Sequence, residues 1–155
     1  MFDVYRKIMA SIEKGLNFEE GLITDKCCKD YYNQQLRLLF YPEVTLDEIN
    51  KTGLTRCGAH SDYGTVALLF QKPGEGQNGL RALNGDKKWV KVVPPDYTMV
   101  VNLGDMFQHW CNDQMISTIH KVEVDEDTLE QLKEGKIERA PERQSIVLFC
   151  HSDRD

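Results

Sequence analysis

Residues 56–71 read Arg56-Cys-Gly-Ala-His-Ser-Asp-Tyr-Gly-Thr-Val-Ala-Leu-Leu-Phe-Gln71, a turn-prone segment that leads directly into an apolar run. The run Thr65–Phe70 is rich in aliphatic and aromatic residues and predicts a strand. His60 and Asp62 precede this strand, so we expect both side chains at a strand end, where ligands can be held rigidly. An imidazole and a carboxylate at this spacing are candidate metal ligands. The pair alone is a weak signal, because it also suits a surface turn that the aspartate caps.

A second histidine strengthens the metal interpretation. His120 lies in Thr118–Val124, which has the alternating pattern of a strand. Two imidazoles and one carboxylate suit a divalent transition metal, and on one face of an octahedral ion they leave three positions open. Non-haem Fe(II) oxygenases use that arrangement. The residues therefore predict a site for a divalent transition metal at His60, Asp62 and His120.

The rest of the chain predicts a mainly β fold after a helical start. Apolar residues recur at helical spacing from Tyr5 to Leu16, and Gly15 is placed to end that helix. We therefore divide the chain into a helical segment, residues 1–34, and a β core, residues 35–155. Short strands separated by turn-forming residues predict a sandwich or barrel with Greek-key or jelly-roll connections. The predicted strands are Gln35–Tyr41, Thr65–Phe70, Trp89–Val93, Thr98–Val101, Thr118–Val124 and Ser145–Cys150.

Two connecting segments carry their own predictions. Asn102–Asp105 reads as a tight turn between strands. Asp125–Glu142 is strongly charged, and Thr128 with Gln131 resembles a capping box that opens a short helix, which Gly135 would end. We interpret this charged segment as a solvated surface excursion.

Alternation along two strands places polar groups on faces that we expect to point inward. Residues two apart share a face of a strand. A buried guanidinium without a partner is very costly, so inward arginines call for a bound anion. Guanidinium and hydroxyl groups together suit a dicarboxylate held beside the metal. The two shared faces are Arg37, Leu39 and Tyr41 on one strand, and Arg143, Ser145, Val147 and Phe149 on the other.

Composition bounds the class of protein. The chain has 155 residues, enough for one domain with a core, and 41% hydrophobic with 28% charged residues predicts a globular protein. A net charge of −6 argues against a nucleic-acid partner, since such proteins concentrate Lys and Arg. Five cysteines without a Cys-x-x-Cys pair indicate reduced thiols. The sequence shows neither a membrane-spanning run nor a signal peptide, so we expect a cytoplasmic protein without a membrane partner.

Four segments together resemble the 2-oxoglutarate- and Fe(II)-dependent dioxygenases of the isopenicillin N synthase-like family. The resemblance covers roughly residues 36 to 151 and is specific because the segments occur in the family's order. It implies a double-stranded β-helix, or jelly roll, with a few flanking helices. Family members carry a longer N-terminal region and a C-terminal helix, so the resemblance implies that this chain is truncated at both ends. The four segments are residues 56–71, Val101–Asp113, Ser117–Val122 and Arg143–Ser145.

The resemblance also implies roles for particular residues. Iron would be bound by the three ligands already predicted, with no catalytic residue beyond them. The distal carboxylate of 2-oxoglutarate would be bound by Arg143 and Ser145, with Tyr41 as a further donor. By alternation, Arg37, Leu39 and Phe149 are candidates for the substrate pocket.

The expected function is an oxidoreductase that uses Fe(II), 2-oxoglutarate and dioxygen. It would oxidise a small organic substrate, in most cases by hydroxylation, and release succinate and CO₂. Two alternatives stay open: a truncated, non-catalytic jelly-roll module that retains a metal and anion site, and an oxidase relative that uses dioxygen without 2-oxoglutarate. The primary substrate and the oligomeric state do not follow from the sequence.

Overall fold

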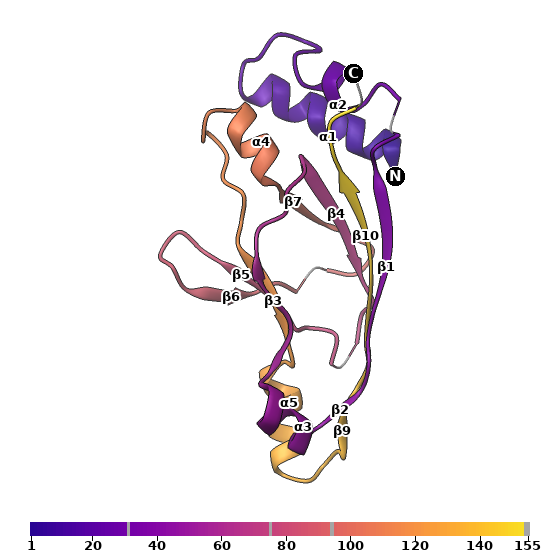
Figure 1. Cartoon of the computed structure of the whole chain (residues 1–155), viewed down its shortest axis with the longest axis vertical. Helices are drawn as coiled ribbons and strands as arrows, with labels where there is room; N and C mark the ends of the chain where they lie inside the picture. The colour runs from indigo at the N-terminus through magenta and orange to yellow at the C-terminus, as the bar shows by residue number, and fades with distance from the viewer. Residues whose placement is uncertain (31, 75, 94, 154–155) are drawn as a thin grey trace.

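The computed structural model describes residues 1–30, 32–74, 76–93 and 95–153. Within these residues, two four-stranded antiparallel sheets form the body of the molecule (Figure 1). The first sheet has the order β1 (Gln35–Tyr41), β10 (Arg143–Cys150), β4 (Val66–Gln71) and β7 (Val100–Leu103). The second has the order β3 (Thr55–His60), β8 (His120–Glu123), β5 (Leu80–Leu83) and β6 (Trp89–Lys91). The predicted jelly roll with flanking helices is confirmed.

The predicted strands correspond closely to those observed. Each of the six overlaps a strand of the structure, and β1 has the predicted bounds. Among the strands of the two four-stranded sheets, the sequence pattern does not predict β3 and β5. In β3 the pairing with β8 shifts register between Thr55 and Cys57 and again between Cys57 and His60. Such irregularities break the alternation by which a strand is recognised.

Helices cover one end of the first sheet's outer face. The predicted N-terminal helix is α1 (Phe2–Gly15), which ends at the expected glycine and lies across the top of the sheet in Figure 1. Tyr5 of α1 is fully buried, and its hydroxyl lies 2.7 Å from the hydroxyl of Thr65. Buried side chains of α1, β4, β10 and α4 (Asp105–Trp110) form one hydrophobic core together with α2 (Thr24–Cys27). The N-terminal segment is thus packed onto the β core.

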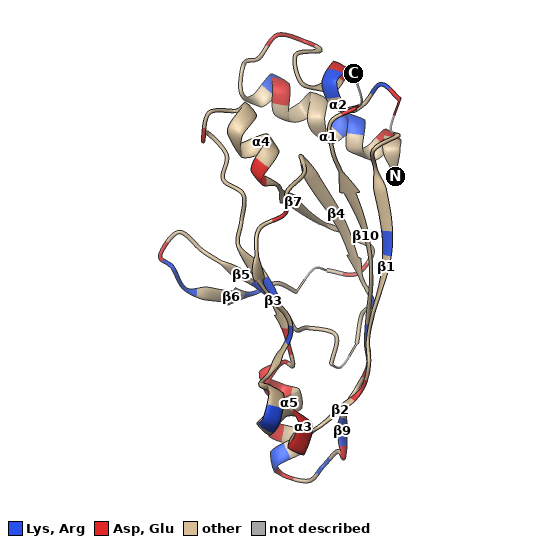
Figure 2. Ribbon diagram, in the orientation of Figure 1, with Lys and Arg blue, Asp and Glu red and all other residues tan. Residues whose placement is uncertain are grey.

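A second, smaller core lies at the opposite end of the molecule. It is built from α3 (Leu46–Thr52), α5 (Glu126–Lys133) and the short pair β2 (Val44–Thr45) and β9 (Arg139–Ala140). Ile49 of α3 and Leu132 of α5 are buried in it. Lys, Asp and Glu residues are frequent along both helices, as the colouring of Figure 2 shows. The segment 125–142 is therefore charged as predicted, but it packs a core and is not a solvated excursion.

The start of α5 also differs from the prediction. Asp125 caps the helix, because its carboxylate accepts a hydrogen bond of 3.1 Å from the backbone N–H of Thr128. The predicted capping box of Thr128 with Gln131 is wrong. The helix is capped three residues earlier, at Asp125, and Thr128 lies inside it. Gly135 follows the helix with φ +70°, as expected of a residue that ends one.

None of the helices formed by the described residues is long and apolar enough to cross a membrane.

Candidate metal centre and its cavity

A cavity of about 230 Å³ lies between the two sheets. Its walls are largely apolar, and its polar groups come from β3 and the loop after it, from β8 and the residues before it, and from the first sheet. The structure brings all of the predicted site residues to this one cavity: Arg37, Leu39, Tyr41, His60, Asp62, His120, Arg143, Ser145 and Phe149.

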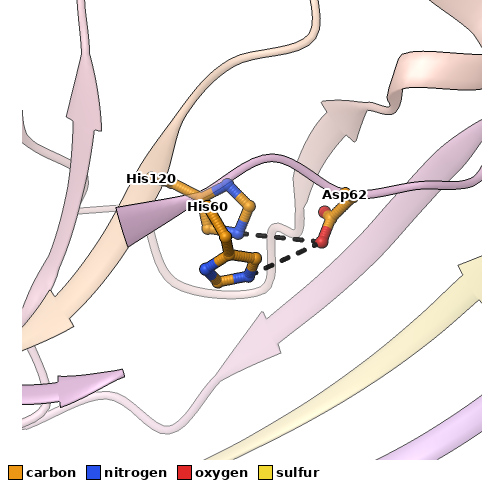
Figure 3. A group of neighbouring side chains, drawn as sticks. All are labelled: His60, Asp62 and His120. Carbon is orange, nitrogen blue, oxygen red and sulfur yellow. Dashed lines mark ion pairs between the residues drawn. The ribbon is translucent and has the colours of Figure 1, made fainter. Parts of the chain in front are cut away.

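The three predicted metal ligands converge (Figure 3). His60 ends β3 and His120 begins β8, and the two are cross-strand partners. Their Nε2 atoms lie 3.8 Å and 3.9 Å from Oδ1 of Asp62, and the three ligand atoms lie within 4.8 Å of one another. Metal bonds of about 2.1 Å allow two ligands of one ion to lie up to roughly 4.2 Å apart, so both His–Asp distances fit a shared cation. The donor set fits a divalent transition metal.

Backbone carbonyls orient both imidazoles toward the shared point. Nδ1 of His60 lies 2.7 Å from the carbonyl oxygen of Gly58, and Nδ1 of His120 lies 3.0 Å from that of Thr118. A protonated Nδ1 donates to the carbonyl and leaves the lone pair on Nε2, which is the nitrogen that faces Asp62 in each ring. Both histidines are therefore held in the tautomer that a metal ligand needs.

Asp62 is held by a residue that sequence reasoning missed. The carboxylate is buried, and the side-chain amide of Asn102 donates to its Oδ2 over 2.6 Å. The predicted tight turn over residues 102–105 is wrong, because Asn102 belongs to β7 and Asp105 starts α4. The alternation of Val100 and Asn102 toward the cavity was the signal that could have identified this residue.

The loop that carries Asp62 is clamped against the start of α4. The backbone N–H groups of Asp105 and Met106 donate to the carbonyls of Asp62 and Tyr63 at 2.7 Å and 3.1 Å. Gly104 permits this approach, since a Cβ there would lie 2.2 Å from the carbonyl oxygen of Gly64. The position of the carboxylate thus depends on a glycine more than forty residues further along the chain.

Arg143 forms the other polar pole of the cavity. The side chain is 1% exposed, and burial lowers its pKa, although an arginine stays protonated under ordinary conditions. Its Nη1 donates to the hydroxyl of Ser145, which is also buried, over 3.3 Å. The ring of Tyr41, opposite Arg143 in the pairing of β1 with β10, lies 5.3 Å from the guanidinium carbon.

The hydroxyl of Tyr41 keeps its proton at neutral pH and can donate a hydrogen bond. Burial raises its pKa from the ordinary value of 10.0, Cys57 adds to the rise, and Arg143 and Arg56 oppose it. Its ring contact with Arg143 places it at the same pole of the cavity.

The predicted substrate-pocket residues lie further along the same two strands. The guanidinium carbon of Arg37 lies 5.1 Å from the ring centre of Phe149, and Leu39 is the cross-strand partner of Ser145. The two histidines outside the triad lie apart from it. His109 is exposed on α4, and the half-buried His151 lies with its ring centre 6.3 Å from that of Tyr63.

Comparison with known proteins agrees with this geometry. The model of the 2OG-Fe(II) oxygenase superfamily matches residues 32–152. The 2-oxoglutarate-Fe(II) type oxidoreductase ppzD of Metarhizium majus is 35% identical over 127 residues, which cover 81% of this chain and 35% of the relative. The 2-oxoglutarate-dependent dioxygenase htyE of Aspergillus rugulosus is 30% identical over 160 residues, which cover 99% of this chain and 44% of the relative. The chain belongs to the 2OG-Fe(II) oxygenase superfamily.

Solved structures give the same result. A full-length Neurospora crassa protein crystallised in complex with alpha-KG superimposes with a TM-score of 0.83 at 29% identity, covering 98% of this chain and 46% of that one. The same protein in complex with alpha-KG and thymine gives a TM-score of 0.80 at 29% identity, covering 98% and 44%. The chain spans less than half the length of these relatives.

Proposed function

We propose that this chain is the core of a 2-oxoglutarate- and Fe(II)-dependent dioxygenase that hydroxylates a small organic substrate. One observation carries the proposal: a His-Asp-His cluster shares a single cavity with a buried arginine that has no carboxylate partner within the described chain. The first group suits the metal and the second suits the cosubstrate. Membership of the superfamily supports both assignments.

The metal would be held by His60, Asp62 and His120. When bound, Fe(II) and 2-oxoglutarate supply the activation of dioxygen, whose two oxygen atoms end in succinate and in the hydroxylated substrate while CO₂ is released. The protein fixes the ligand atoms before the ion arrives, through the Nδ1 contacts of both rings and the Asn102 amide on Asp62. Such supporting contacts typically change metal affinity by about 10- to 100-fold.

The distal carboxylate of 2-oxoglutarate would be bound by Arg143, Ser145 and Tyr41. A planar guanidinium pairs with a carboxylate through two parallel hydrogen bonds, and hydroxyl donors satisfy the remaining lone pairs. Because Arg143 and Ser145 are nearly inaccessible to solvent, water competes little for these bonds. The apolar walls of the cavity would likewise limit the access of water to the metal.

The primary substrate would enter beside Arg37, Leu39 and Phe149. Alternation on β1 and β10 turns these side chains into the cavity, and Arg37 makes no ion pair with any residue that the structure describes. The cavity volume suits a small molecule. The Neurospora crassa relative, which has been solved with thymine, supports a substrate of that size.

Three finer assignments belong to the same proposal. We place the chain with the isopenicillin N synthase-like members of the superfamily, on the four sequence segments described above. We assign catalysis to residues 35–155 and treat residues 1–34 as a helical segment attached to that core. The five free cysteines support a reducing, cytoplasmic location.

An anaerobic titration tests the proposal without needing the substrate. Fe(II) and 2-oxoglutarate added together should produce a visible charge-transfer band that neither gives alone. Turnover in air with candidate substrates should then release succinate in step with product. Binding of both without succinate under any condition would favour a non-catalytic module, and turnover that does not require 2-oxoglutarate would favour an oxidase. No binding of either would contradict the assignment.

A further inference from the structure

Arg143 is a buried cation whose hydrogen-bond partners among the described residues are all neutral. Each of its three nitrogens has a partner among the described residues: Nε donates to the backbone oxygen of Gln77 at 3.3 Å, Nη1 to Ser145 Oγ at 3.3 Å, and Nη2 to Oε1 of Gln71 at 2.5 Å. In the part of the chain that the structure describes, no Asp or Glu lies within ion-pair distance of it. The positive charge is thus fixed in place but not neutralised.

The donor count leaves room for one carboxylate. An arginine has five N–H groups, and these hydrogen bonds engage three of them, one on each nitrogen. One N–H therefore remains on each of the two terminal nitrogens. Two donors on neighbouring nitrogens match the two oxygens of a carboxylate.

Gln71 holds the guanidinium from the neighbouring strand. It is the cross-strand partner of Ser145 in the pairing of β4 with β10, and its side chain is half-buried. Its amide oxygen accepts from Arg143, as a glutamate oxygen at this position would. A glutamate differs in charge but hardly in size, so the neutral amide is what leaves the cation uncompensated.

Gln77 fixes the backbone on either side of Arg143. Its side-chain amide donates to the carbonyl of Glu142 over 2.6 Å and accepts from the N–H of Gln144 over 3.1 Å. Orientation of the arginine therefore has a source other than Gln71, and a change at position 71 can alter the charge of the pole without releasing the strand.

We propose that Gln71 is a positioning residue whose neutrality makes the site selective for a 2-oxo acid with a second carboxylate. This inference rests on the proposed function, because it takes Arg143 as the binding group for that carboxylate. A glutamate at position 71 would form an ion pair with Arg143. It would then neutralise the positive charge that binds the distal carboxylate of the cosubstrate. Oxo acids with an uncharged tail gain nothing from the free cation and would be affected little.

Calorimetry on the whole chain loaded with Mn(II), in place of Fe(II), measures this without turnover. The two ligands are 2-oxoglutarate and 2-oxovalerate, which have the same chain length but differ in the distal carboxylate. Gln71→Glu should weaken 2-oxoglutarate by at least about tenfold, as expected for loss of a charge-assisted bidentate pair, and should change 2-oxovalerate by less than about threefold. Gln71→Met, which keeps the size and the neutrality, should retain more of the preference for the diacid than Gln71→Glu.

The control is Gln144→Glu, the same chemical change on the exposed outer face of β10, one residue from Arg143. It should leave the ratio of the two affinities unchanged. An unchanged ratio in Gln71→Glu, or equal loss of both ligands, would overturn the inference and leave Gln71 a purely structural residue. Failure of the wild-type chain to bind 2-oxoglutarate would instead count against the proposed function.

Discussion

His120 supplies one of the three candidate ligand atoms, which lie within 4.8 Å of one another, and little else in the structure depends on its ring. Its replacement by alanine should therefore remove the metal while leaving the fold in place. We expect His120→Ala to lose stoichiometric iron after anaerobic loading and desalting, measured by elemental analysis, with an unchanged circular dichroism spectrum. His109→Ala, an exposed histidine on α4, is the matched control and should retain iron. Iron retained by both variants would remove His120 from the site.

At this scale, the residues that the sequence reveals are those with a distinctive type and spacing. His60, Asp62 and His120 could be predicted because a His-x-Asp pair and a distant strand histidine form a recognisable set. Asn102 and Gln71 were not predicted: alternation with Val100 could have placed Asn102 on the inward face, but an amide on a strand has no evident role until its partner is known. Their partners, Asp62 and Arg143, lie 40 and 72 residues away in the chain. The pairing of β4 with β10 brings Gln71 to Arg143, and the loop after β3 brings Asp62 to Asn102 of β7.

Between elements, the contact of Gly104 with the loop after β3 has no room for a side chain. Gly104→Ala would place a Cβ 2.2 Å from the carbonyl oxygen of Gly64 and 2.9 Å from that of Asp62. The loop must move, so we expect a loss of about 1–3 kcal/mol in the free energy of unfolding together with weaker metal binding. Urea unfolding and a metal titration measure the two effects. Gly85→Ala, where a Cβ would meet nothing within 4 Å, should change neither.

The burial of Cys150 in the core beneath α1 makes the free energy of unfolding sensitive to alkaline pH. Burial raises the pKa of Cys150 from 9.0 to about 12, with Cys27 contributing. As the pH rises, the unfolded chain therefore loses the Cys150 proton before the folded state does. The contribution of this proton to the free energy of unfolding is fully present below pH 9 and is lost as the pH rises toward 12. One such proton corresponds to a slope of up to about 1.4 kcal/mol per pH unit.

Urea unfolding at several pH values checks this slope. Cys150→Ala should be less stable at pH 7 but should lose less stability between pH 9 and pH 11 than the wild-type chain does. Parallel curves for the two proteins would show that Cys150 does not carry the effect.

The elements themselves were predictable where their pattern is regular. The alternation of β1 and the helical spacing of α1 gave both with nearly correct bounds. Among the elements that were not predicted are β3, whose pairing is irregular, and α4, whose start reads as a turn. The local sequence does not show which other segments pack against these elements. The charged segment 125–142 was misjudged for the same reason: its few apolar residues find a core only when α3 lies beside α5.

For the whole molecule, the proposed metal site would couple metal binding to stability, because its candidate ligands are attached to both sheets. His60 and His120 belong to the second sheet, whereas Asp62 is tied through Asn102 to β7 of the first. A ligand that binds only the folded state raises its stability by about 2.7 kcal/mol at a hundredfold excess over Kd. We expect the melting temperature to rise with Mn(II) concentration and to fall with a chelator.

The matched control for that experiment is His120→Ala, whose melting temperature should not respond to Mn(II). A response as large as that of the wild-type chain would mean that the ion stabilises the fold from another site.

The amide–carboxylate bond between Asn102 and Asp62 has a consequence for the life of the protein in a cell. An ion bound by His60, Asp62 and His120 would link the two sheets, because this hydrogen bond ties Asp62 to β7 of the first sheet. Without the ion, the two sheets would separate more often. Proteases cut the opened form in proportion to its population when opening and closing are fast. On the proposed metal assignment, iron supply would then set how long the polypeptide survives.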